Sequence, residues 1–72
     1  MAELEILSVV ALLEDIPQKG LRRGQVGTVV EALASGVYEV DFSDDSGRSY
    51  VSAAISGNLV LRLLHEATSQ AA

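Results

Sequence analysis

The side chains that could support catalysis are few. The chain has one histidine, His65, close to its C-terminal end, and it has no cysteine. A Ser-His-Asp or Cys-His arrangement would have only this histidine available as its base. Residues near a chain end are seldom held firmly enough to act as a general base. We therefore predict no catalytic residue, and we predict that the protein is not an enzyme.

Three aspartates around one turn could supply oxygen ligands to a hard cation such as Ca²⁺ or Mg²⁺. They are Asp41, Asp44 and Asp45. Their spacing does not follow the EF-hand loop, which also needs a closing glutamate. Aspartate is common at turns because it hydrogen-bonds the local backbone. We therefore predict neither a metal site nor a cofactor.

The glycine-rich segment 20–27 invites comparison with a phosphate-binding loop. It contains Gly20, Gly24 and Gly27. A P-loop ends in Gly-Lys-Ser/Thr and leads into the N-terminus of a helix. Segment 20–27 lacks this ending and leads into a β-rich stretch. The glycines at 20 and 24 are better explained as turn positions that allow positive φ.

Lys19, Arg22 and Arg23 form the basic cluster of the chain. Such a cluster could contact an acidic protein or RNA, or it could be a solvated loop tip. Charges of opposite sign on two regions of one small domain can steer docking between subunits or to a partner. We predict these three residues as the polar part of a partner-binding surface. The opposing acids are Glu31, Glu39, Asp41, Asp44 and Asp45.

Composition narrows the class of protein. The 72 residues carry a net charge of −5 and are 49% hydrophobic, which excludes an acidic disordered chain. An acidic balance opposes non-specific binding to nucleic acid, which depends on neutralising phosphates. A small domain without disulfides has a marginal core and often completes it by self-association. We expect a homo-oligomer with an unknown protein partner, and we do not expect nucleic acid binding.

The apolar run 6–13 could be mistaken for a targeting segment. It is too short to span a bilayer. Glu3 and Glu5 precede it where a signal peptide needs positive charge, and Glu14 and Asp15 follow it in place of small residues. We expect a cytoplasmic protein with no membrane contact.

The pattern of apolar residues predicts an all-β domain over residues 5–64, followed by a flexible or short helical tail at 65–72. Residues 37–42 alternate most regularly and place Tyr38, Val40 and Phe42 toward the core. Leu21 should tuck into the core from the long loop 14–24. Gly27 suggests a β-bulge or a close backbone crossing. Residues 56–58 form a short turn, either irregular or 3₁₀. The predicted strands are 6–13, with a helix as the alternative, 25–34, 37–42, 48–55 and 59–64.

The second faces of these strands are unusually apolar. Successive residues of a strand point to opposite faces, so these apolar residues cannot all point inward if their chain neighbours do. A strand that buries only one face should carry polar residues on the other face. Either the register differs from the one assumed, or part of the outer face meets a partner. We predict Val60 and Leu64 as candidates for an apolar interface. The full set is Leu7, Val9, Val51, Ala53, Ile55, Val60 and Leu64.

A family resemblance covers about residues 8–63. The chain resembles an uncharacterised family of small bacterial domains with an acidic-Ile-Pro loop, a Gly-Leu pair, Gly-x-x-Gly-Thr-Val-Val-Glu and a Tyr-Glu-Val-Glu-Phe strand. The matching residues are Leu12, 14–17, 20–21, Gly24, 26–31, 38–42, Gly47 and the final leucine-rich strand. This family brings no established activity.

More distantly, residues 24–30 are similar to the KOW motif of ribosomal and transcription-factor domains. They also resemble the SH3-like barrels of nitrile hydratase β subunits and of the photosystem I subunit that helps dock ferredoxin. The resemblance implies a five-stranded SH3-like barrel with a long loop after the first strand, acting mainly by binding. RNA-binding KOW domains are usually basic, however, and this chain is acidic.

Together these features predict a non-enzymatic protein-interaction module or accessory subunit that self-associates. One alternative is a KOW-like RNA-binding or ribosome-associated domain that uses the same basic loop, which salt-dependent retention of RNA would reveal. Another is an antitoxin-like regulatory partner whose acidic surface covers a basic protein.

Overall fold

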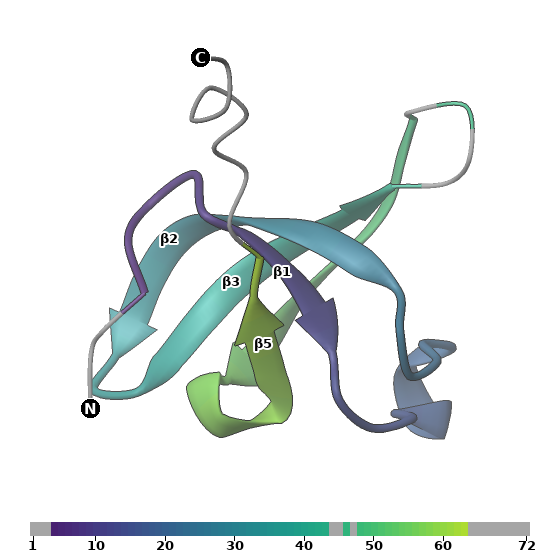
Figure 1. The fold of residues 1–72 in the computed structure, drawn as a ribbon, viewed down its shortest axis with the longest axis horizontal. Helices are drawn as coiled ribbons and strands as arrows, with labels where there is room; N and C mark the ends of the chain where they lie inside the picture. Colours follow the sequence, from purple (N-terminus) through teal and green to yellow (C-terminus); the bar gives the residue numbers. More distant parts are fainter. Residues whose placement is uncertain (1–3, 44–45, 47, 64–72) are drawn as a thin grey trace, which may run out of the picture.

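The computed structural model describes residues 4–43, 46 and 48–63. Their strands form one open antiparallel sheet with the order β4-β3-β2-β1-β5 (Figure 1). The described residues contain no α-helix, and the arrangement is consistent with a small SH3-like barrel, as predicted. The elements are β1 (Val9–Leu12), η1 (Pro17–Lys19), β2 (Val26–Ala34), β3 (Val37–Ser43), β4 (Ser49–Ser56), η2 (Gly57–Leu59) and β5 (Val60–Arg62).

The first strand is shorter than the predicted run 6–13. A turn occupies its beginning, in which the amide of Ser8 donates to the carbonyl of Glu5 over 3.0 Å. Leu7 in this turn has φ 74°. The strand that follows is rich in valine, which suits an extended backbone. The helical alternative for this segment is wrong.

The register of the β2–β3 hairpin is irregular at two points. The register shifts between Val29 and Glu31 and again between Ala32 and Ala34, so the irregularities lie well beyond Gly27. Gly27 itself pairs in register with Phe42 on β3 and Val10 on β1. Of the two possibilities at Gly27, a bulge is wrong. A close crossing is confirmed, because a Cβ atom on Gly27 would lie within 3.0 Å of side-chain atoms of Val40 and Phe42 and of the carbonyl oxygen of Asp41.

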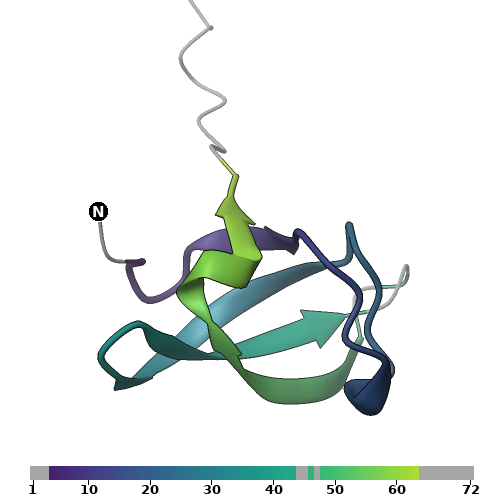
Figure 2. The ribbon, with the colours of Figure 1, turned by 90° about the horizontal axis from the view of Figure 1, so that it is seen from below.

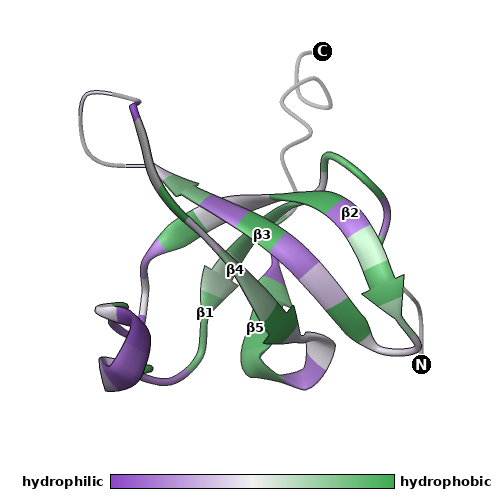
Figure 3. Cartoon of the chain, turned by 180° about the vertical axis from the view of Figure 1, so that it is seen from behind, coloured by the Kyte–Doolittle hydropathy of each residue, from purple (hydrophilic) through white to green (hydrophobic). Residues whose placement is uncertain are grey.

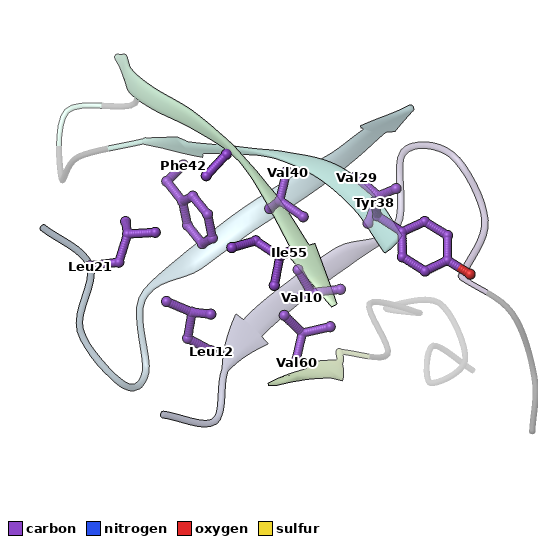
Figure 4. Packing of buried hydrophobic residues seen from close by; sticks show 10 residues of the cluster. Val10, Leu12, Leu21, Val29, Tyr38, Val40, Phe42, Ile55 and Val60 are labelled. Atoms are coloured by element: carbon purple, nitrogen blue, oxygen red, sulfur yellow. The ribbon is translucent and has the colours of Figure 1, made fainter. Parts of the chain in front are cut away.

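The core lies between the β3–β4 part of the curved sheet and the β1–β5 part (Figures 2 and 4). Tyr38, Val40 and Phe42 of β3 are all buried, as their alternation predicts. Leu21 enters from the loop and is only 1% exposed, which confirms its predicted place. The core residues are Val10, Leu12, Leu21, Val29, Tyr38, Val40, Phe42, Ala53, Ile55 and Val60.

The end of the chain corrects a predicted interface residue. Residues 57–59 form the short 3₁₀ helix η2, and β5 covers only Val60–Arg62 instead of 59–64. Val60 is 8% exposed and belongs to the core. A side chain buried within its own domain is not available as a surface anchor, so the prediction of Val60 as an interface residue is wrong. Leu64 and the tail 65–72 lie outside the described residues.

Candidate interaction surfaces

The long loop between β1 and β2 is held closed by its own backbone. The amide of Ile16 donates to the carbonyl of Leu21 over 2.9 Å, and the amide of Leu21 donates back over 3.1 Å. Pro17 starts η1 between them, and Gly20 ends it in the left-handed region with φ 69°. The buried side chain of Leu21 fixes this small turn to the core.

The second half of the loop is fixed by side chains that bind backbone amides. Gln25 Oε1 accepts from the amide of Arg22 over 2.6 Å, and Asp15 Oδ1 accepts from the amide of Arg23 over 2.8 Å. The amide of Gly24 donates to the carbonyl of Leu12 in β1 over 2.8 Å. The backbone that carries the two arginines is therefore well anchored, although their side chains are exposed.

The three predicted basic residues share this loop. Lys19 lies in η1, and Arg22 and Arg23 follow Leu21. All three are exposed, and no ion pair joins any of them to another described residue. An open cavity of about 250 Å³ lies beside them, lined by Asp15, Pro17, Gly20, Leu21 and Arg22. The loop therefore places one acidic and one basic residue, Asp15 and Arg22, at a small hollow that Pro17 and Leu21 also line.

A second surface lies on the outer side of the sheet. Ala11 pairs in register with Val26 of β2 and with Leu61 of β5. Its chain neighbours Val10 and Leu12 are buried, so Ala11 and its two partners point away from the core. Val26 is 45% exposed and Leu61 is 54% exposed. With Val9, two residues before Ala11 on the same side, they form what we call the apolar outer face (Val9, Ala11, Val26, Leu61).

The outer side of β3 and β4 has the opposite character. Glu39 pairs with Ala54, and Asp41 pairs with Ser52. The hydroxyl of Ser52 donates to Asp41 Oδ1 over 3.4 Å. In Figure 3, hydrophilic bands alternate with hydrophobic ones along β3. The outer side of the sheet is thus apolar over β1 and β5 and acidic over β3.

The register explains the apolar second faces seen in the sequence. Ala53, Ile55 and Val60 are buried, and Val51 packs against the core. For these residues, the register assumed from the sequence was wrong, and their apolar character is explained by burial in the core and not by a partner. Val9 remains on the outer side. Sequence analysis missed Ala11, Val26 and Leu61 because they come from three separate strands, and only the register brings them into one row.

The candidates for chemistry gain no support from the described part of the chain. His65, Asp44 and Asp45 lie outside it. Among the described residues, no group of three or more His, Cys, Asp or Glu could hold a metal ion. The same residues form no helix of sufficient length and apolarity to cross a membrane.

The fold and these surfaces define a small all-β domain with two distinct exposed surfaces. The model of a family described as a domain of unknown function (DUF4926) matches residues 6–61, and the chain belongs to this family. Membership confirms the predicted resemblance to an uncharacterised family of small domains. No curated protein and no solved structure matches the chain.

Proposed function

We propose that this domain is a non-enzymatic protein-interaction module and that a second copy covers its apolar outer face. The observation that carries the proposal is the row Leu61–Ala11–Val26, which places two exposed aliphatic side chains on either side of a small one. Contiguous apolar surface on a small soluble domain marks an interaction site.

The shape and charge of the row Leu61–Ala11–Val26 allow it to pack against the same row of a second copy. The short side chain of Ala11 leaves a low point between Leu61 and Val26. A twofold axis that runs parallel to the strands, between the two facing sheets, would place Leu61 of each copy against Ala11 of the other, which is an isologous contact between packed sheets. The row contains no acidic residue, so two copies with a charge of −5 each would approach here with the least repulsion. Each half-exposed aliphatic side chain would contribute about 1 kcal/mol on burial.

Sedimentation equilibrium over a range of concentrations tests this proposal. The wild-type domain should show a concentration-dependent dimer, and Leu61→Lys should remain a monomer. Leu33→Lys is the matched control, because Leu33 is 44% exposed but lies at the far end of β2. A monomeric wild type, or equal association of all three proteins, would overturn the proposal.

The basic loop supports a second contact, with an acidic partner. No ion pair joins Lys19, Arg22 or Arg23 to another described residue, although the chain has ten acidic and five basic residues. The neighbouring carboxylate of Asp15 accepts from the backbone amide of Arg23. The backbone amides of Arg22 and Arg23, and not their side chains, fix the loop. The double substitution Arg22→Ala and Arg23→Ala should therefore remove charge without releasing the loop.

A pull-down from the native host, with and without nuclease and over increasing salt, tests this second contact. A stoichiometric protein that survives nuclease and is lost with the double variant would support it. Retention of RNA that is lost with nuclease would favour the KOW-like alternative instead. Equal capture by wild type and double variant would exclude the loop as the contact.

A further inference from the structure

The two edges of the sheet differ in how they are protected. Edge strands in native proteins are usually short, charged or interrupted by proline, because their free backbone groups can pair with other chains. β5 follows this rule, since it has three residues and ends in Arg62. β4 does not follow it, since its eight residues, Ser-Tyr-Val-Ser-Ala-Ala-Ile-Ser, include no charge, proline or glycine. β4 lies at the opposite end of the strand order from β5.

The backbone of β4 has unmet hydrogen-bonding capacity. β4 pairs with β3 over Val51–Ser56 and again at Ser49, and no strand pairs with its other side among the described residues. The hydrogen bonds that tie loops and turns together in the described part of the chain include none from β4. In an antiparallel strand, alternate residues direct their N–H and C=O groups away from the partner. An added strand could satisfy these groups.

The side chains next to this edge indicate what kind of strand would fit. Ser52 and Ala54 are short and exposed on the outer side of β4. Behind them on β3 lie Asp41 and Glu39. Since neighbouring strands are about 4.8 Å apart, a strand added to β4 would lie roughly 10 Å from β3. Lysine or arginine side chains on its outer face would span most of this distance over the short β4 residues, toward Glu39.

We propose that the free edge of β4 accepts an extended basic segment of a partner protein by β-strand addition. Backbone hydrogen bonds would supply affinity, and an outward lysine or arginine residue would supply specificity through Glu39. Pairing of β4 with β4 of a second copy would place two acidic β3 strands about 14 Å apart in one sheet and would bring no opposite charge to Glu39. The proposal goes beyond the self-association described above and does not depend on it.

An eight-residue peptide of alternating lysine and valine is a suitable probe, and an alternating glutamate and valine peptide is its charge control. A third peptide keeps the lysines but carries N-methyl groups at alternate residues, which removes its hydrogen-bond donors on one edge. Binding is followed by amide chemical shifts and by hydrogen exchange of β4 in the full chain. The lysine peptide should bind and slow exchange in β4, and the other two should not.

Protein variants locate the site. Ala54→Lys and Ser52→Lys each place a charge at the edge, and each should weaken binding about tenfold, which corresponds to 1.4 kcal/mol. Glu39→Gln should weaken it more than its control Glu31→Gln, because Glu31 lies on β2, one strand further from the edge. Leu61→Lys should bind like wild type, which separates this test from that of self-association.

Several results would overturn the proposal. The first is binding of the N-methylated peptide. The second is binding of the lysine peptide by Ala54→Lys and Ser52→Lys as tight as that by wild type. The third is no binding of the lysine peptide to the folded domain. Slow exchange of all β4 amides in the free monomer would also contradict it, because the edge would then already be covered. A self-paired β4 edge would appear as a dimer that Leu61→Lys retains and Ala54→Lys loses, and this too would overturn it.

Discussion

Gly27 of β2 lies opposite Phe42 of β3, and a Cβ atom on Gly27 would come within 2.9 Å of Cδ1 of Phe42. The same atom would lie 2.7 Å from Cγ1 of Val40 and 3.0 Å from the carbonyl oxygen of Asp41. Two of these neighbours are fully buried core side chains, and the third is backbone. The absence of a side chain at Gly27 is therefore what allows β2 to cross this part of the core.

Gly27→Ala should consequently destabilise the domain by about 1–3 kcal/mol, the usual cost of overpacking a core. Urea unfolding followed by circular dichroism measures this loss. The control is Gly57→Ala, in which the added Cβ atom would lie 3.1 Å from Cε2 of the Tyr38 ring, its nearest neighbour. Since a ring can shift more easily than backbone, Gly57→Ala should cost less. Equal stability of Gly27→Ala and wild type would contradict the close crossing.

Leu21 should be the residue that holds the long loop to the core of the sheet. Leu21→Ala removes a side chain that is 1% exposed and should cost about 2–5 kcal/mol. Hydrogen exchange of the Ile16 and Leu21 amides should accelerate at the same time. Leu13→Ala is the matched control, because Leu13 is 45% exposed and its loss should cost much less. Similar stability of the two variants would show that the loop does not depend on Leu21.

Leu7 adopts φ 74°, a conformation that costs an L-residue about 1–2 kcal/mol. Glycine normally destabilises a protein relative to alanine because its unfolded chain is more flexible. At position 7 this ranking of glycine and alanine should be reversed, because glycine adopts a positive φ without steric cost. Leu7→Gly should therefore be more stable than Leu7→Ala. Thermal unfolding of the two variants gives the comparison. A more stable alanine variant would mean that position 7 does not hold positive φ in solution.

Ser8 has a buried hydroxyl oxygen with no hydrogen-bond partner among the described residues. The backbone of Ser8 is hydrogen-bonded, since its carbonyl accepts from the amide of Val29 over 2.9 Å. Ser8→Ala keeps the backbone bonds and removes only the unpaired hydroxyl. It should be neutral or stabilise the domain by up to about 1 kcal/mol. A clear loss of stability in chemical denaturation would show that the hydroxyl has a partner.

Local patterns were sufficient for much of the fold. The alternation of Tyr38, Val40 and Phe42 placed β3 and its buried face correctly, because a period of two is intrinsic to an extended backbone. Leu21 between two glycines predicted a loop pinned to the core. The end of the chain was harder to predict. Leu59 and Leu61 look equivalent in sequence, yet Leu59 packs against the core from η2 and Leu61 is exposed on β5.

The amino-acid sequence by itself determined the all-β class, the long loop, the central core strand and the position of the basic cluster. Each of these depends on residues close together in the chain, through backbone preference and alternation. Tertiary structure alone decided that Val60 is a core residue, that Ala11 joins Val26 and Leu61 in one apolar row, and that β4 is an open edge. These features depend on register and strand order, which arise from pairing between segments distant in sequence.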